Sequence, residues 1–167
     1  MALAQALLPE FDHEMAGTRR TLERVPEGRL SWRPHPKSYT LGELATHLAN
    51  LHSWIVRIFE NESVDIAPPG QPPRRPEPLT SRQALLATFD KHLAEGRARL
   101  AAATDEQMRA PWTLLFGGKT VFTMPRAASL RSMVMNHGVH HRAQLGVYLR
   151  LLDVSVPGLY GPSADEQ

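Results

Sequence analysis

The most constraining feature of this chain is a run from about Leu130 to Leu152 in which apolar residues recur at helical spacing. Successive residues of an α-helix are rotated by about 100°, so His137 and His141 lie about 40° apart on one helix face. Four apolar residues share that face: Leu130, Val134, Tyr148 and Leu152. Both imidazoles are therefore expected to point into the core, where two histidines at this spacing can bind one metal ion.

Three other segments have helical periodicity, over about residues 2–25, 41–59 and 80–103. The second begins with a capping-box pattern, Thr40 followed by Glu43, and the residues from Thr80 to Gln83 form a similar pattern before the third. The last helix is expected to begin at Pro125 and to end near residue 153. Four long amphipathic helices predict an all-α fold, a four-helix bundle forming a single domain over residues 1–167.

Two segments cannot belong to these helices. The stretch from Ile66 to Leu79 contains six prolines, which predict a stiff loop that crosses the bundle. Aromatic and β-branched residues over 112–116 and 119–123 flank Gly117-Gly118, which predicts a β-hairpin before the last helix. An isolated hairpin is marginally stable, so it is expected to pack on the bundle. The loop and the hairpin together could enclose the open side of a binding site.

Polar residues also fall on the apolar faces of the first three helices. His47 lies at the centre of such a face, whereas His52 points elsewhere and is expected at the surface. His92 lies on the inward face of the third helix, where a lone histidine is more often a hydrogen-bonded core residue than a metal ligand. Glu14 lies within the inward face of the first helix and is interpreted as a carboxylate paired with an arginine. The alternative for Glu14 is an acid–base role or support of a metal site.

The buried histidines of two helices form a candidate metal site made of His47, His137 and His141. Each buried imidazole has a donor and an acceptor to satisfy, and one divalent ion would bind all three rings. The remaining ring N–H groups could donate to Glu43 or Gln144. His140 lies at the margin of the same face and competes for ligand status, which spacing alone does not exclude. Since the rings must be neutral to bind, metal occupancy is expected to fall below about pH 6.5.

Composition narrows the function classes. The chain has no cysteine, which excludes disulfides, cysteine-based zinc sites and thiol nucleophiles, and suits a reducing cytoplasm. The net charge is only +2, and the pairs Arg19-Arg20 and Arg74-Arg75 are scattered, as is typical of a solvated surface. The apolar start, Met1 to Leu8, lacks the basic region of a signal peptide and is too short for a membrane span. We therefore expect a cytoplasmic protein that binds neither nucleic acid nor a membrane.

Several motifs together resemble the DinB-like (damage-inducible) family of metalloenzymes over nearly the whole chain. They are Arg33-Pro34-His35-Pro36-Lys37-Ser38, the segment from Tyr39 to His47, the segment from His137 to Leu145, and the tail from Val147 to Ser163. Ala143 stands where that family more often has glycine in Arg-Gly-Gln. The resemblance implies a four-helix bundle, often a homodimer, that binds a divalent metal, commonly zinc or nickel. The implied ligands are His47, His137 and His141. Family members with known activities are transferases or isomerases that use low-molecular-weight thiols such as bacillithiol or mycothiol.

Three functional hypotheses follow. The first is an enzyme, because three protein ligands and an exchangeable position are typical of catalytic zinc; Gly138, however, replaces the glutamate of H-E-x-x-H proteases. The second is a binding or stress protein whose metal is structural, with a fourth ligand from His92, His140 or Glu14. The third, nucleic-acid binding, lacks a basic face.

Of these hypotheses we favour a metal-dependent enzyme. The expected reaction is transfer of a small-molecule thiol to an electrophile, and metal-dependent hydrolysis is the alternative. A chain without cysteine must take its sulfur nucleophile from a cosubstrate. No general base is assigned; the candidates for a catalytic role are Glu14, His92 and Gln144.

The face of the last helix opposite the histidines predicts a homodimer. It carries four small or apolar residues, Met135, Val139, Ala143 and Gly146, and is too apolar for a solvated face. The alternative is that this face packs on the hairpin or the tail of the same chain. The family resemblance favours the dimer.

Overall fold

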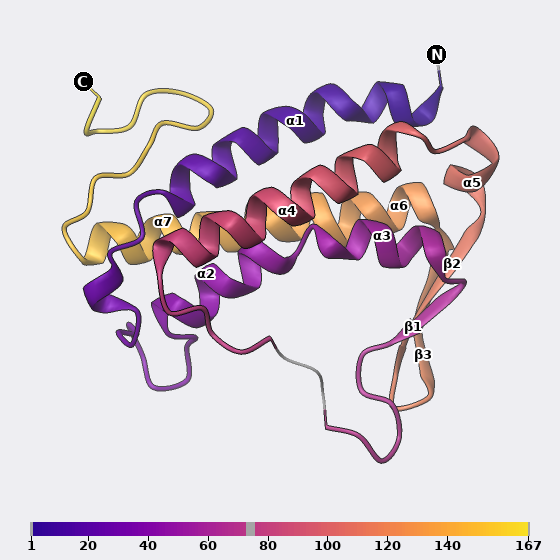
Figure 1. Ribbon diagram of the computed structural model, residues 1–167, viewed down its shortest axis with the longest axis horizontal. Helices are drawn as coiled ribbons and strands as arrows, with labels where there is room; N and C mark the ends of the chain where they lie inside the picture. Colours follow the sequence, from indigo (N-terminus) through magenta and orange to yellow (C-terminus); the bar gives the residue numbers. More distant parts are fainter. Residues whose placement is uncertain (1, 73–75, 167) are drawn as a thin grey trace.

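A computed structural model describes residues 2–72 and 76–166 of the protein. Pro73 and the predicted surface pair Arg74-Arg75 lie outside the described residues. The structure is mostly helical, with a small three-stranded sheet at one end (Figure 1). Within the described residues, no helix is both long enough and apolar enough to cross a membrane.

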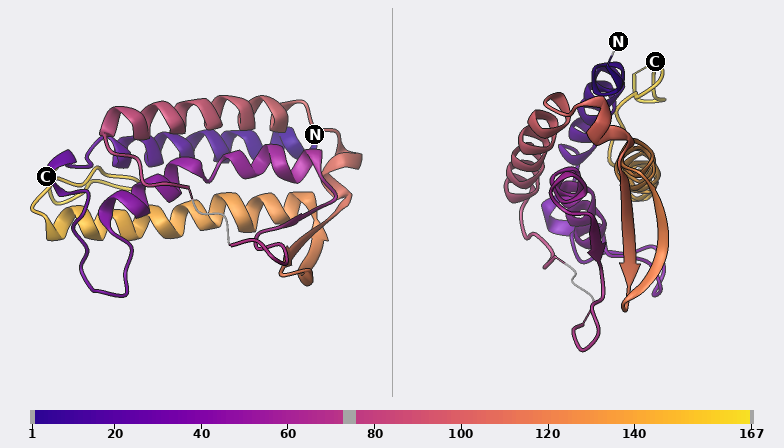
Figure 2. Two further views of the ribbon diagram at one scale, coloured as in Figure 1. Left: turned by 60° about the horizontal axis from the view of Figure 1, so that its bottom comes forward. Right: turned by 90° about the vertical axis from the view of Figure 1, so that its right-hand side faces the viewer.

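The long helices lie side by side along the longest axis of the molecule (Figures 1 and 2). They are α1 (Leu3–Leu22), α2 (Leu41–Asn50) with α3 (Ser53–Glu60), α4 (Arg82–Ala101), and a last helical stretch that ends with α7 (His137–Leu151). Helix α1 packs on α4 and α7, and α2 packs on the same two helices. Their inward faces form one core, in which Phe11, Leu44 and Phe89 are almost completely buried. The helical periodicity of the sequence therefore predicted the faces that meet.

Local signals located the starts of α2 and α4 to within one residue. The capping box of α2 is confirmed, since the Thr40 hydroxyl accepts from the Glu43 backbone N–H at 3.1 Å and the Glu43 carboxylate accepts from the Thr40 N–H at 2.6 Å. Helix α4 is capped by Ser81, whose hydroxyl accepts from the Ala84 N–H at 3.1 Å, one residue later than the predicted Thr80. A short helix that the sequence analysis missed, α5 (Asp105–Arg109), follows α4.

The predicted hairpin is confirmed, and it belongs to a larger sheet. Strand β2 (Pro111–Phe116) pairs antiparallel with β3 (Lys119–Pro125), and Gly117 and Gly118 turn between them at φ values of 59° and 77°. The missed strand is β1 (Ser63–Asp65), which pairs parallel with β2. The carboxylate of Asp65 accepts from the N–H groups of both turn glycines, at 3.2 and 2.7 Å. This contact fastens the start of the proline-rich segment to the hairpin.

The last helical stretch is interrupted by a π-helical segment. Helix α6 (Arg126–Leu130) leads into η2 (Arg131–Asn136), and α7 begins at His137. A π-helix has i→i+5 hydrogen bonds, so each turn holds more residues than in an α-helix and the faces shift. Both Val134 and Met135 are consequently buried, at 1% and 3% exposure. The placement of Met135 on a free dimer face was therefore wrong.

The rest of the predicted dimer face is only partly free. Ala143 is exposed, but Gly146 faces the C-terminal tail, whose Val156 lies 3.8 Å from the position of an added Cβ. Part of the alternative, packing on the tail of the same chain, thus applies at Gly146. Farther along α7, Val147 and Leu151 are each 58% exposed.

His52 is buried, so its placement at the surface was wrong. The sequence analysis predicted one helix over 41–59, but a turn at Leu51–His52 separates α2 from α3 and rotates His52 into the core, with 0% exposure. Its ring lies edge-on to Phe89 and Phe11, with centroids 5.0 and 6.3 Å away. Neither ring nitrogen has a hydrogen-bond partner within the described residues. Burial, and to a smaller extent His92, lowers the pKa of His52 to about 3.

Replacing His52 with leucine is expected to make the folded state less sensitive to acid. An unfolded histidine binds a proton below about pH 6.5, whereas buried His52 stays neutral to a much lower pH. Its contribution to stability is complete above pH 6.5 and is lost as the pH falls toward the folded pKa. At about pH 5 the loss is about 2 kcal/mol, because that pH lies about 1.5 units below the unfolded pKa.

Urea unfolding of both proteins at about pH 8 and about pH 5 measures the difference. The control is the same substitution at the exposed His13, which should leave the pH dependence of the wild type unchanged. An equal acid-induced loss of stability in the wild type and in His52→Leu would contradict the prediction.

Candidate metal site

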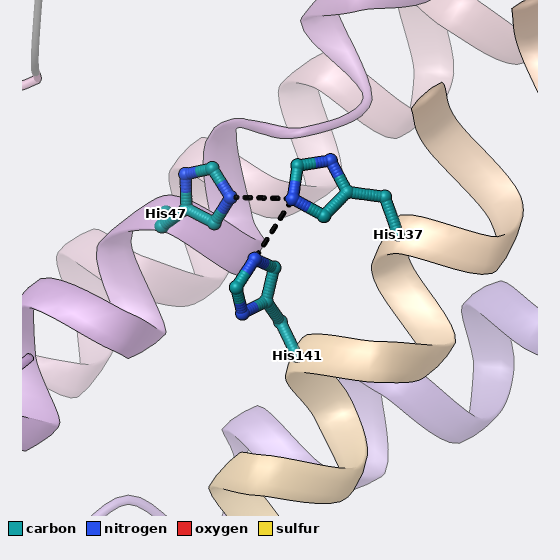
Figure 3. Close-up of side chains that lie close together, drawn as sticks. All are labelled: His47, His137 and His141. Atoms are coloured by element: carbon teal, nitrogen blue, oxygen red, sulfur yellow. Dashed lines mark hydrogen bonds between the residues drawn. The ribbon is translucent and has the colours of Figure 1, made fainter. Parts of the chain in front are cut away.

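Three histidines meet between α2 and α7. His47 lies on α2, and His137 and His141 lie one turn apart on α7, with their rings pointing toward one another (Figure 3). The Nε2 atom of His137 is 3.3 Å from Nε2 of His47 and 2.8 Å from Nε2 of His141. One ligand atom from each ring lies within 4.8 Å of the others, so the three residues could hold a metal ion. The structure therefore brings together the three residues that the sequence analysis proposed.

Hydrogen bonds at Nδ1 define the tautomers of the His137 and His141 rings. Nδ1 of His141 lies 2.7 Å from Oε1 of Gln144, and Nδ1 of His137 lies 3.3 Å from the Met133 carbonyl oxygen. Because a carbonyl oxygen can only accept, both Nδ1 atoms donate, and each Nε2 presents a lone pair. The predicted hydrogen bond between a ring of the site and Gln144 is thus present, whereas the contact with the Met133 carbonyl had no signal in the side-chain pattern.

The geometry of these lone pairs fits a cation. No hydrogen bond can form between Nε2 of His137 and Nε2 of His141 when both protons are on Nδ1, so the two lone pairs repel each other at 2.8 Å. Nitrogen ligands bound at about 2.05 Å to a tetrahedral ion are about 3.3 Å apart, which is the separation of the His47 and His137 nitrogens. Imidazole ligands suit several transition metals, among them iron, nickel, copper and zinc. The donor set therefore matches a divalent ion of this class.

Burial keeps all three rings neutral. Burial, and to a smaller extent the neighbouring His141 and His137, lowers the pKa of His47 to about 4. Burial is also the main reason that the pKa values of His137 and His141 are below the ordinary histidine value. Neutral imidazoles are the form that binds metal. Protons therefore compete with a metal at a lower pH than the value of about 6.5 expected from the sequence.

The π-helical segment supports His137. The backbone N–H of His137 bonds to the Val134 carbonyl rather than to that of Met133. The Met133 carbonyl, four residues before His137, can therefore accept from the imidazole. A π-helical segment beside a binding residue is a common feature of functional sites.

The remaining candidates lie outside this cluster. His140 is exposed and contacts only the side of the His141 ring, with centroids 4.9 Å apart. His92, on α4, lies with Nδ1 3.4 Å from the Ala49 carbonyl oxygen, which fits a hydrogen-bonded core histidine. Neither belongs to the group of ligand atoms that converge at His47.

Glu14 pairs with an arginine, as its first interpretation predicted. Its carboxylate accepts from Arg142 at 2.6 Å and from the Tyr160 hydroxyl at 2.8 Å, and the Arg142 guanidinium also donates to the Glu14 backbone carbonyl at 2.8 Å. The side chains of Arg142 and Glu14 are only 2% and 12% exposed. Of the candidate catalytic residues, Gln144 alone is hydrogen-bonded to a ring of the site.

A cavity of about 460 Å³ opens beside the histidines. His47 and His137 line it together with Trp54 and Arg57 of α3, and Ile66 and Pro76 of the proline-rich segment close one side. A second hollow on the other side of Pro76 is also lined by His47, with Tyr39 and Glu43.

The prediction that the proline-rich loop and the hairpin enclose the open side of the site is therefore half correct. The proline-rich segment lines both hollows, but no residue of the β2–β3 hairpin does so among the described residues. The hairpin acts indirectly, since Trp112 packs edge-on against Trp54 with centroids 6.4 Å apart. Sequence analysis had not singled out Arg57, although it lies one turn beyond Trp54 on the helix path that carries His47.

Comparisons with known proteins agree with this picture. The sequence model of the DinB family matches residues 2–167. The uncharacterized protein YrdA of Bacillus subtilis (strain 168) is 26% identical over 166 residues, which cover 95% of this chain and 89% of YrdA. Among solved structures, a DinB-like protein from Bacillus cereus ATCC 10987 superimposes with a TM-score of 0.73 at 22% identity, covering 93% of this chain and 97% of that one. The DinB-like protein YjoA of Bacillus subtilis gives a TM-score of 0.70 at 18% identity, covering 95% and 99%.

Proposed function

Because this chain belongs to the DinB family over residues 2–167, we propose that it is a four-helix-bundle protein that binds a divalent metal ion through His47, His137 and His141. The metal is zinc or nickel. The protein uses it as an enzyme that transfers a low-molecular-weight thiol to an electrophilic small molecule.

The convergence of three Nε2 atoms beside a cavity is the observation that carries this proposal. Two of the rings are oriented by Gln144 and by the Met133 carbonyl, so their metal-binding atoms are preorganised. Within the described residues, no fourth histidine or carboxylate joins the cluster, and His47 and His137 both face the cavity. Three protein ligands with an adjoining space are typical of catalytic rather than structural zinc.

Bound there, the ion would supply a positive charge that favours the deprotonated form of a thiol or of water. The residues of the chain do the rest. Trp54, Ile66 and Met133 give the cavity apolar surface, which excludes water from the reacting groups. In the transfer, the thiol sulfur forms a bond to carbon, the leaving group departs with its electron pair, and the thiol proton passes to solvent.

The test is to load the protein with zinc or nickel and to offer bacillithiol, mycothiol or glutathione with a chloronitroaromatic electrophile. Release of the thioether is followed by absorbance, beside a panel of esters without thiol. We expect thiol-dependent turnover that a chelator abolishes and that added metal restores. Ester turnover without thiol would instead support hydrolysis, and no turnover of either kind by metal-loaded protein would remove the enzyme hypothesis.

The homodimer is also a proposal. Four residues on one face of α7 follow each other at four-residue intervals, and at least the last two leave apolar surface exposed: Val139, Ala143, Val147 and Leu151. An exposed apolar stripe of this kind suits a helix of a second copy.

A further inference from the structure

Among the described residues, the cavity beside the histidines has one permanently charged side chain. Apart from His47 and His137, its described lining consists of apolar or neutral polar residues and Arg57. Arg57 therefore provides the permanent charge of this cavity within the described residues.

Arg57 is held in place and, in the part of the chain that the structure describes, has no acidic partner. Its guanidinium carbon lies 5.3 Å from the centroid of the Trp54 ring, so the side chain leans back along α3 over the indole. Within the described residues, no carboxylate forms an ion pair with Arg57. Four other arginines form two-pronged pairs with carboxylates: Arg19, Arg97, Arg131 and Arg150. The N–H groups of the Arg57 guanidinium are thus available to bind a ligand.

Apart from Arg57 and the histidines, most of the cavity lining is apolar. Trp54, Ile66 and Met133 contribute to it, the Asn50 amide donates to the Thr46 carbonyl at 2.9 Å, and the Ser53 hydroxyl donates to the Asn50 carbonyl at 2.8 Å. Arg57 follows His47 by ten residues, beyond the turn at Leu51–His52, and its side chain leans back along α3 toward that turn. A ligand that fills this space has an apolar or aromatic body and an acidic group at one end.

We propose that Arg57 binds the carboxylate of an organic acid whose apolar body lies against Trp54, and that this acid is the electrophilic substrate. A guanidinium pairs with a carboxylate through two parallel hydrogen bonds, and the indole holds it in the required orientation. The reacting carbon then lies at the end of the cavity formed by His47 and His137. Only this last step rests on the proposed function; recognition of the acid does not.

Affinity for a matched pair of probes tests the proposal without turnover. Naphthoate and naphthamide have the same aromatic body and differ in charge, and isothermal titration calorimetry at about pH 7.5 gives both affinities. The titrations use the protein as isolated and after chelator treatment, because a metal ion can also bind a carboxylate. We expect naphthoate to bind about tenfold more tightly than naphthamide in both preparations, and Arg57→Gln to bring the ratio to about one.

Arg99→Gln is the matched control. Arg99 also lies over an aromatic ring, with its guanidinium carbon 4.3 Å from the centroid of Phe59, but it lines a different hollow beside Glu95. It should keep the tenfold preference, and Arg57→Lys should keep part of it. Equal binding of both probes by the wild type, or an unchanged preference in Arg57→Gln, would overturn the proposal.

Metal content and thiol-dependent turnover are measured on the same samples. Loss of the naphthoate preference in Arg57→Gln supports the acid site even if the wild type shows no turnover. Thiol transfer without that preference leaves the proposed function in place and removes the acid site.

Discussion

Replacing His137 with alanine is expected to lower the metal affinity of the protein more than about 100-fold, since loss of even an outer hydrogen-bond partner of a ligand costs 10–100-fold. His137 is the central ring of the three, because its Nε2 contacts Nε2 of both His47 and His141. Its removal leaves two ligands on different helices. Elemental analysis after dialysis against a weak chelator should find the wild type loaded and His137→Ala nearly free of metal.

His140→Ala is the control for this experiment. His140 lies on the same helix and beside His141, but it is exposed and outside the ligand cluster, so its replacement should leave metal content unchanged. His52→Ala is less suitable, since His52 is fully buried and its loss would create a cavity. Full metal occupancy in His137→Ala would refute the ligand assignment.

Replacing Glu14 with alanine is expected to destabilise the protein by about 3–5 kcal/mol, the usual cost of leaving one charge of a buried ion pair without its partner. Arg142 is 2% exposed and donates to both the carboxylate and the backbone carbonyl of Glu14. Without the carboxylate, its charge would remain in the core with one carbonyl and the Tyr160 hydroxyl as close acceptors. Urea unfolding at neutral pH measures the change.

The reverse substitution, Arg142→Met, should cost less. Glu14 is 12% exposed and keeps its hydrogen bond from Tyr160, so its charge can be solvated more easily than that of Arg142. A surface pair provides the baseline: Asp12→Ala breaks an ion pair with Arg97 whose side chains are 42% and 48% exposed, and should cost about 1 kcal/mol or less. A loss in Glu14→Ala no larger than in Asp12→Ala would contradict the prediction.

Local signals explain why much of the fold could be predicted. The Thr40 cap, the Gly117-Gly118 turn and the helical periodicity each act within a few residues, so they can be recognised without the tertiary structure. Strand β1 could not be recognised in this way. It has three residues and exists only because it pairs with β2, about fifty residues away.

The same distinction between local signals and tertiary contacts applies to the candidate site. His47, His137 and His141 stand out because they interrupt apolar faces, and Gln144 follows His141 by less than one turn. The cavity depends on the approach of separate segments, so the part played by Arg57 could not be deduced from spacing, although the proline-rich segment was expected beside the site. The π-helical segment and the turn at His52 were missed for a related reason. Both shift the phase of a helix, and a periodic pattern assumes that the phase is constant.

The proline-rich segment is fastened at both ends to the parts of the protein that surround the site. At its start, Asp65 bonds to the turn of the hairpin, and at its end the Leu79 backbone N–H donates to the Thr46 hydroxyl at 2.8 Å, one residue before His47. Between these anchors, substitutions in lining residues such as Ile66 or Pro76 can reshape the cavity without altering the helices that hold the histidines. The loop side of the cavity and the proposed metal site can therefore evolve independently, since the first lies in a segment of loop and the second in two helices.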